Sequence, residues 1–114
     1  MKVHEIVQAL SLEVLAGASL LDRPVTGGYA SDLLSRVLAA AKAGNVWVTL
    51  QNHPNVVAVA SLLDLAAVIV TEGPEVGPET VARAQEHGVV LLRTPHDTFT
   101  IVARLAEMGV EGVR

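Results

Sequence analysis

The sequence predicts an α/β fold, a three-layer α/β/α domain with a mainly parallel sheet of four or five strands. Segments with strand character alternate with helical segments along the chain, as in folds built from strand–helix–strand units. The strand segments at 46–50 and 67–71 are almost wholly apolar, which is typical of parallel strands covered on both faces. Hydrophobic residues make up 51% of the chain but aromatic residues only 3%, so small aliphatic side chains must fill the core.

The first part of the chain is expected to supply a helix and two strands. Apolar residues at helical spacing predict a short helix over residues 4–10. A strand is expected over residues 12–15, ended by Gly17. Val25 is expected to close a further short strand, directly before a glycine turn at 27–28.

Two helices flank the clearest strand of the sequence. Apolar residues at helical spacing predict a helix over residues 31–43, which Gly44 stops. The strand at 46–50 follows, and Pro54 then opens a second helix that ends near Leu65. This second helix is apolar almost all round. It therefore lies inside the fold or packs its outer side on a partner.

The last part of the chain repeats the alternation. The strand at 67–71 precedes a helix over residues 78–87 that carries proline at its first position. A strand at 89–92 follows. Residues 94–97 resemble a capping box for a final helix that ends at Gly109, and the tail beyond it is expected to fray.

Composition bounds the kind of protein. A chain of 114 residues has the length of one domain, taken here as residues 1–114. Its mean hydropathy of +0.46 implies more apolar surface than a small domain hides alone, which indicates an oligomer. The alternative is a core that is simply rich in Ala and Val. The net charge of −4 argues against a nucleic-acid partner, because binding phosphates requires clustered Lys and Arg. The chain has no cysteine, and its histidines lack metal-ligand spacing, so neither a metal nor another cofactor is expected.

The hydropathy pattern bears on the cellular compartment. No apolar run reaches the length of a membrane span, and the longest candidate, at 56–70, is interrupted by Ser61 and Asp64. The start of the sequence lacks the apolar stretch of a signal peptide. We therefore expect a cytoplasmic protein without a membrane partner.

The segment 25–32 is the first candidate for a binding site. Gly27 and Gly28 precede a predicted helix start at Ser31 and Asp32, and a glycine-rich turn before a helix exposes backbone N–H groups that bind anions. The alternative is a turn that only needs the conformational freedom of glycine, followed by an ordinary helix cap. The sequence has no Walker lysine and no G-x-G-x-x-G, so the usual nucleotide-loop signatures are absent.

Two further groups of polar residues are candidates. Thr49, Asn52 and His53 follow the strand at 46–50, and the carboxyl ends of parallel strands commonly form a binding crevice. Histidine can act as an acid or a base near neutral pH, but these residues equally suit a turn before the helix at Pro54.

Asp22 and Arg23 form the second of these groups. They are either an ion pair that holds the loop or a receptor for an anion, which arginine recognises with paired donors.

These motifs carry a resemblance to a known family. Asp22, Arg23, Thr26, Gly27 and Gly28 spell the letters of a signature, with two residues inserted before the threonine. The chain resembles the DRTGG domain family, which is named for that signature. The blocks at 28–35 and 46–60 also resemble stand-alone bacterial and archaeal members, and the resemblance extends over roughly residues 12–105.

The resemblance implies a regulatory or assembly module. Such domains occur alone, beside CBS domains in regulated pyrophosphatases, or ahead of phosphotransacetylase catalytic domains. A similar module precedes the kinase part of HPr kinase/phosphorylase. In these settings the domain is non-catalytic and tends to lie at subunit contacts.

We therefore expect a non-catalytic, ligand-sensing regulatory module that binds a nucleotide or another small anion. It is expected to form a homodimer through the helix at 31–43 or the helix at 55–65. The expected binding residues are Asp22, Arg23, Thr26, Gly27, Gly28, Ser31, Asp32, Thr49, Asn52 and His53.

Two alternatives stay open. One is an assembly domain without a small-molecule ligand, whose polar motifs only shape turns. The other is a small hydrolase or lyase in which His53 acts with Asp32 or Glu72, although no complete catalytic set is visible.

Overall fold

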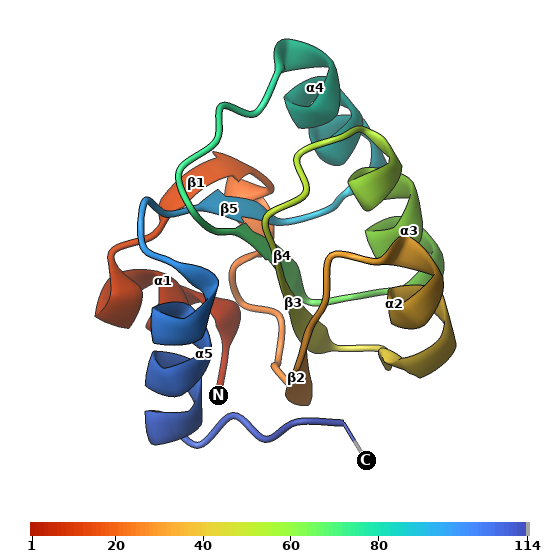
Figure 1. Cartoon of the computed structure of the whole chain (residues 1–114). Helices are drawn as coiled ribbons and strands as arrows, with labels where there is room; N and C mark the ends of the chain where they lie inside the picture. The colour runs from red at the N-terminus through yellow and green to blue at the C-terminus, as the bar shows by residue number, and fades with distance from the viewer. Residues whose placement is uncertain (114) are drawn as a thin grey trace.

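The computed structural model describes residues 1–113 and shows one five-stranded sheet between two layers of helices (Figure 1). The strands are β1 (Glu13–Ala16), β2 (Gly27–Ala30), β3 (Asn45–Thr49), β4 (Ala67–Val70) and β5 (Leu91–Arg93). The helices are α1 (Val3–Leu10), α2 (Leu34–Ala40), α3 (Asn55–Leu63), α4 (Pro78–His87) and α5 (Thr98–Glu107). Strands β2 to β5 are parallel, and β1 joins β5 in antiparallel orientation. The predicted fold class is confirmed.

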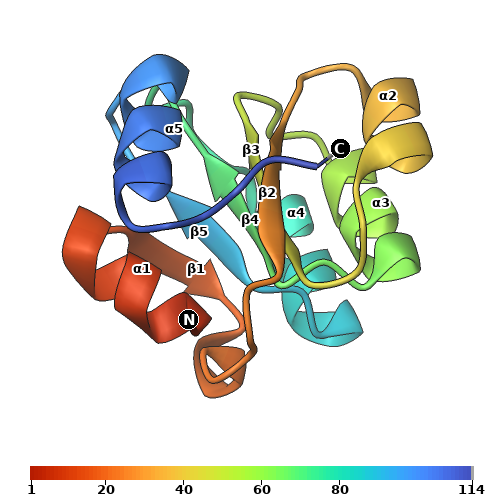
Figure 2. The same cartoon turned by 90° about the horizontal axis from the view of Figure 1, so that it is seen from below.

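The spatial order of the strands is β1-β5-β4-β3-β2, so the first two strands lie at opposite edges of the sheet. Helices α2, α3 and α4 cover one face, and α1 and α5 cover the other (Figure 2). Because β1 is antiparallel, it ends where the parallel strands begin. The connection over residues 17–26 must therefore cross the amino ends of β5, β4 and β3 before it enters β2.

Side-chain alternation explains why the central strands are apolar throughout. Trp47 of β3 packs with α2, α3 and α4, whereas its neighbours Val46 and Val48 pack with α1 and α5. In β4, Val68 and Ile69 divide between the two faces in the same way. Both faces of the central sheet are buried, as the sequence pattern indicates.

Helix α1 begins with a local cap. The main-chain N–H of Lys2 donates a 2.7 Å hydrogen bond to Oε2 of Glu5. That bond lowers the pKa of the exposed Glu5 carboxyl below its ordinary value. The cap is therefore complete at neutral pH and is lost as the pH falls through that lowered pKa.

The predicted glycine turn at 27–28 is wrong, because both glycines lie within β2. They pair with β3 on one side and meet the C-terminal tail on the other, where Gly28 N–H donates a 2.8 Å hydrogen bond to the carbonyl of Glu111. A Cβ on Gly27 would lie 3.0 Å from that carbonyl oxygen, and one on Gly28 would lie 3.1 Å from Cγ1 of Val110. Close packing around this edge strand favours glycine here, and neither glycine forms a turn.

Two smaller predictions concern the same region. The tail that was expected to fray lies beside β2 over residues 110–113, with Val110 packed against the core, and Arg114 lies outside the described residues. Val25 does not close a strand before the glycines, since β2 begins only at Gly27.

The helix predicted over residues 31–43 is shorter in the structure. Helix α2 spans only Leu34–Ala40, and Leu33 stands at its N-cap. Ser31 is still extended, with its N–H donating to the carbonyl of Val48 at 3.2 Å, so it cannot cap the helix. At the other end Ala41 has extended backbone angles, which stop the helix before Gly44.

The predicted capping box at 94–97 is also wrong. Helix α5 begins only at Thr98, after Asp97. The hydroxyl of Thr94 accepts the N–H of His96 at 3.2 Å instead, and the first helical N–H, from Thr98, donates to Oε2 of Glu72 at 3.0 Å. A residue 26 positions away therefore provides the cap.

The remaining predicted elements occur, with ends that differ by one or two residues. Proline opens α4, whose Glu79 and Arg83 pair at 3.3 Å. Among residues 1–113, none of the helices is long and apolar enough to traverse a lipid bilayer.

Gly44 offers a direct test of the connection between α2 and β3. Its φ is +82°, and an added Cβ would lie 2.7 Å from Oγ1 and Cγ2 of Thr26. We predict that Gly44→Ala lowers the free energy of unfolding by about 1–3 kcal/mol. Urea denaturation followed by the fluorescence of buried Trp47 measures this change.

Gly77→Ala is the matched control. Gly77 has a φ of −65°, and no atom lies within 4 Å of the added Cβ. Its change should stay within about 0.5 kcal/mol. A Gly44→Ala variant as stable as the control would contradict the predicted strain.

Candidate functional site

The structure divides the predicted binding residues between opposite edges of the sheet. Residues 22–28 precede or open β2, at the amino edge of the parallel strands. Ser31 and Asp32 follow β2, and the residues at 49–53 follow β3, at the carboxyl edge. A four-residue strand is about 13 Å long, so the two groups do not form one site.

Arg23 lies at the amino edge and joins two loops. Its Nη2 donates to the carbonyl of Gly88 at 2.8 Å, and its Nη1 donates to the carbonyl of Leu65 at 3.3 Å. Leu65 lies just before β4, and Gly88 lies between α4 and β5. The guanidinium therefore links the chain segments that enter these two strands. The alternative of an ion pair between Asp22 and Arg23 is wrong, since the ion pairs among residues 1–113 involve other arginines.

Thr26 holds the next loop along the same edge. Its hydroxyl donates to the carbonyl of Ala43 at 2.8 Å and accepts Nδ2 of Asn45 at 3.2 Å. Asn45 is buried, and its Oδ1 also accepts the N–H of Lys42 at 2.8 Å. Sequence reasoning missed Asn45. The only signal for it in the sequence is that a polar residue stands directly before the apolar run at 46–50.

A hollow of about 300 Å³ opens at this edge. Arg23 and Thr26 line it, together with Asp64, Leu65 and residues of the loop before β3. Arg23 is partly buried there and has no carboxylate partner within residues 1–113. Arg23 thus lines an open hollow, and two carbonyls hold its positively charged guanidinium in place.

The carboxyl edge is organised around Asp32. Its Oδ1 accepts the hydroxyl of buried Thr49 and the N–H of Leu50, both at 2.8 Å. Gln51 donates to the carbonyl of Asp32 at 3.1 Å, and the indole of Trp47 donates to the carbonyl of Ser31 at 2.8 Å. Asp32 therefore ties the end of β2 to the end of β3.

Asn52 and His53 are also engaged within the chain. The side chain of Asn52 donates to the carbonyl of Glu75 at 2.6 Å, and Nδ1 of His53 accepts the N–H of Asn55 at 3.1 Å. Within residues 1–113, no hydrogen bond joins His53 to Asp32 or to Glu72. The polar residues of this edge mainly satisfy one another.

Comparisons with known proteins identify the family and the fold. The family model of the DRTGG domain matches residues 5–108. No curated protein matches the chain. Among solved structures, the chain is similar to the CBS and DRTGG domains of the regulatory region of Clostridium perfringens pyrophosphatase, complexed with the activator diadenosine tetraphosphate. The TM-score is 0.74 and the identity 20%, over 96% of this chain and 47% of that one. The likeness shows the fold, and this chain spans about half the length of its neighbour.

Asp32 generates a prediction for the carboxyl edge. Replacing it by alanine leaves a buried hydroxyl, that of Thr49, without its acceptor, so Asp32→Ala should destabilise the fold by about 1–3 kcal/mol. Asp22→Ala removes an exposed carboxylate and should change stability by less than about 0.5 kcal/mol. Chemical denaturation of wild type and both variants measures these changes in the free energy of unfolding. Equal stabilities of Asp32→Ala and Asp22→Ala would show that the Asp32 contacts contribute nothing.

Proposed function

The chain belongs to the DRTGG domain family, and from this premise we propose that it is a non-catalytic regulatory module that binds a nucleotide or other small anion beside Arg23 and assembles as a homodimer. The similar solved structure is a regulatory region in complex with a nucleotide activator. The observation that carries the proposal is the guanidinium of Arg23, which lines a hollow without a carboxylate partner among the described residues.

The chemistry of Arg23 suits an anion. A guanidinium has five N–H donors, of which two carbonyls of this chain take one each, so donors remain for a phosphate or carboxylate. The two carbonyl bonds also hold the side chain in place before a ligand arrives. This preorganisation lowers the entropy cost of binding.

The other residues of the hollow favour a nucleotide over a simple anion. The carboxylate of Asp64 and the hydroxyl of Thr26 line the same space as Arg23. A bare phosphate would be repelled by a nearby carboxylate, whereas the hydroxyl groups of a ribose donate to one. A ligand with a phosphate at one end and hydroxyl donors at the other matches both charges.

The carboxyl edge supports a non-catalytic role. The carboxylates of Asp32 and Glu72 each accept main-chain N–H groups, and His53 accepts another. A general base must reach the proton that it removes, and a histidine base needs an orienting partner. These side chains hold turns and helix ends, so the hydrolase or lyase alternative has no geometric support.

The homodimer is supported by the surface of α2 and α3, which pack side by side (Figure 1). Helix α3 carries no charged residue, and α2 carries only Arg36. Leu62 on α3 is 76% exposed and Leu38 on α2 is 44% exposed. Two copies of a chain with net charge −4 approach with least repulsion through a face that carries no acidic residue on either helix.

Ligand binding predicts a thermal shift. A nucleotide present at 100 times its Kd should stabilise the fold by about 2.7 kcal/mol, because it binds only the folded state. We expect a saturable rise in Tm with at least one member of a panel of nucleotides, phosphorylated metabolites and simple anions. Arg23→Gln should abolish this rise, after circular dichroism has shown that the variant is folded.

His53→Ala is the control for the opposite edge and should leave the shift unchanged. Loss of the shift in His53→Ala but not in Arg23→Gln would place the ligand at the carboxyl edge and refute the role of Arg23. No shift with any compound would refute ligand sensing and favour the assembly domain.

Self-association predicts a specific response to charge on α3. Leu62→Glu places like charges at the proposed contact. Sedimentation velocity should therefore give the mass of a dimer for wild type and the mass of a monomer for this variant. Phe99→Glu, on the opposite face of the sheet and 82% exposed in wild type, should keep the dimer. A monomeric wild type, or a dimer that only Phe99→Glu disrupts, would contradict the proposed interface.

A further inference from the structure

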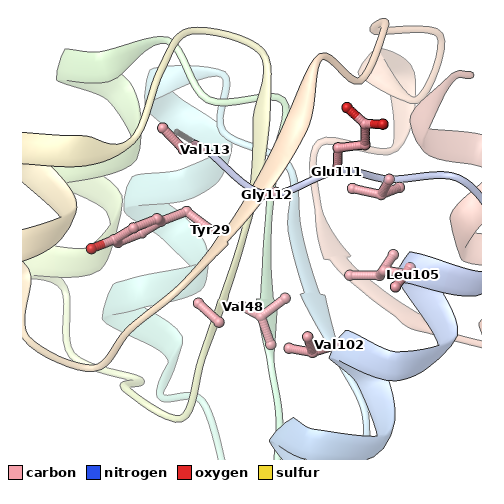
Figure 3. Close-up of a pocket in the computed structure, with 11 residues that line it drawn as sticks. Tyr29, Val48, Val102, Leu105, Glu111, Gly112 and Val113 are labelled. Carbon is pink, nitrogen blue, oxygen red and sulfur yellow. The ribbon is translucent and has the colours of Figure 1, made fainter.

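An apolar groove lies on the α1–α5 face, beside β2 (Figure 3). On this face α5 packs against β3, and only the tail at 110–113 crosses β2 (Figure 2). The groove between them has a volume of about 280 Å³. Ala30 and Val48 line it from the sheet, and Val102 and Leu105 line it from α5.

The edge of β2 beside this groove offers main-chain hydrogen bonds. Successive N–H groups of a strand point to opposite sides, and Ser31 N–H points inward to the carbonyl of Val48. The N–H groups of Gly28 and Ala30 therefore point outward. The N–H of Gly28 donates to the carbonyl of Glu111 in the tail. The N–H of Ala30 has no acceptor within residues 1–113. Among residues 1–113, the second half of this edge therefore has no main-chain partner.

The side chains that line the groove are mostly apolar. The lining residues are apolar or small except for Tyr29 and Glu111, and Glu111 carries the one formal charge among them. Val102 is 40% exposed, and Phe99, one helical turn earlier on α5, is 82% exposed. The apolar wall thus continues outward from the groove along the helix.

We propose that the open edge at Ala30 and this groove bind an extended segment of a partner protein. The segment pairs with β2 at Ala30, beyond the hydrogen bond between Gly28 and Glu111. It places one or two apolar side chains against Val48 and Val102, and a Lys or Arg beside Glu111. A helix does not suit the site, because its N–H and C=O groups are already bonded internally and cannot pair with a strand edge.

This surface is separate from the two surfaces of the proposed function. The hollow at Arg23 lies at the amino edge, and Leu62 lies on the opposite face of the sheet. Variants in the groove can therefore be judged independently of nucleotide binding and of the proposed dimer contact.

The experiment pans the full chain against a displayed library of random linear decapeptides and measures recovered peptides by fluorescence anisotropy. We expect recovered sequences to alternate β-branched or other apolar residues with polar ones and to carry Lys or Arg. Val102→Asp puts a carboxylate in the groove, and Ala30→Pro removes the outward N–H without breaking the ladder to β3. Each change should weaken binding at least tenfold.

Ala103→Asp is the matched control, since Ala103 is an exposed residue of the same helix that does not line the groove. It should leave affinity within twofold of wild type. The proposal is overturned if no peptide is enriched over a blank surface, or if Val102→Asp binds recovered peptides as tightly as Ala103→Asp. It is also overturned if Val102→Asp alone changes the sedimentation mass, because the groove is then occupied by a second copy of this chain.

Discussion

The fold depends on the connection that crosses the amino edge of the sheet. Since β1 and β2 occupy opposite edges, this connection must pass the entrances of three parallel strands. Arg23 bonds the carbonyls before β5 and β4, and Thr26 bonds the carbonyl before β3. Buried or partly buried carbonyls need donors, and the crossing segment supplies them in the order in which it meets them. The family signature is therefore first a structural device, which fixes where the parallel strands begin.

This device changes where a ligand is expected. In doubly wound sheets, ligands usually bind at the carboxyl edge. Here the polar residues of that edge are joined to one another through Asp32 and Thr49, and the carboxylate of Glu72 caps α5. The amino edge instead holds an arginine that is positioned by two neutral carbonyls and forms no ion pair among residues 1–113, with the carboxylate of Asp64 elsewhere in the same hollow. The proposed anion site therefore lies at the amino edge, unlike the usual ligand site of this fold class.

The sequence predicted those parts of the structure that local chemistry controls. The apolar strands and the helix opened by a proline follow from residues adjacent in the chain, and their positions are nearly right. Gly27 and Gly28 failed as a turn because the atoms that exclude side chains there belong to residues some 80 positions later. Asp32 failed as a helix residue because its acceptor role is fulfilled across the sheet, at Thr49. Composition cannot distinguish a glycine that provides a flexible turn from a glycine that is crowded by its neighbours. The distinction depends on which distant residues pack against it.

The same long-range contact links the surfaces of the molecule. An edge strand with unpaired N–H and C=O groups invites further pairing, and proteins usually cover such edges. Among residues 1–113, the tail, which carries glycine at 109 and 112, pairs with β2 at Gly28, and the N–H of Ala30 has no partner. Strand β2 starts beside Thr26 in the hollow at Arg23 and ends beside the apolar groove. A displacement of this four-residue strand would therefore connect the proposed anion site at Arg23 with the proposed partner site at Ala30.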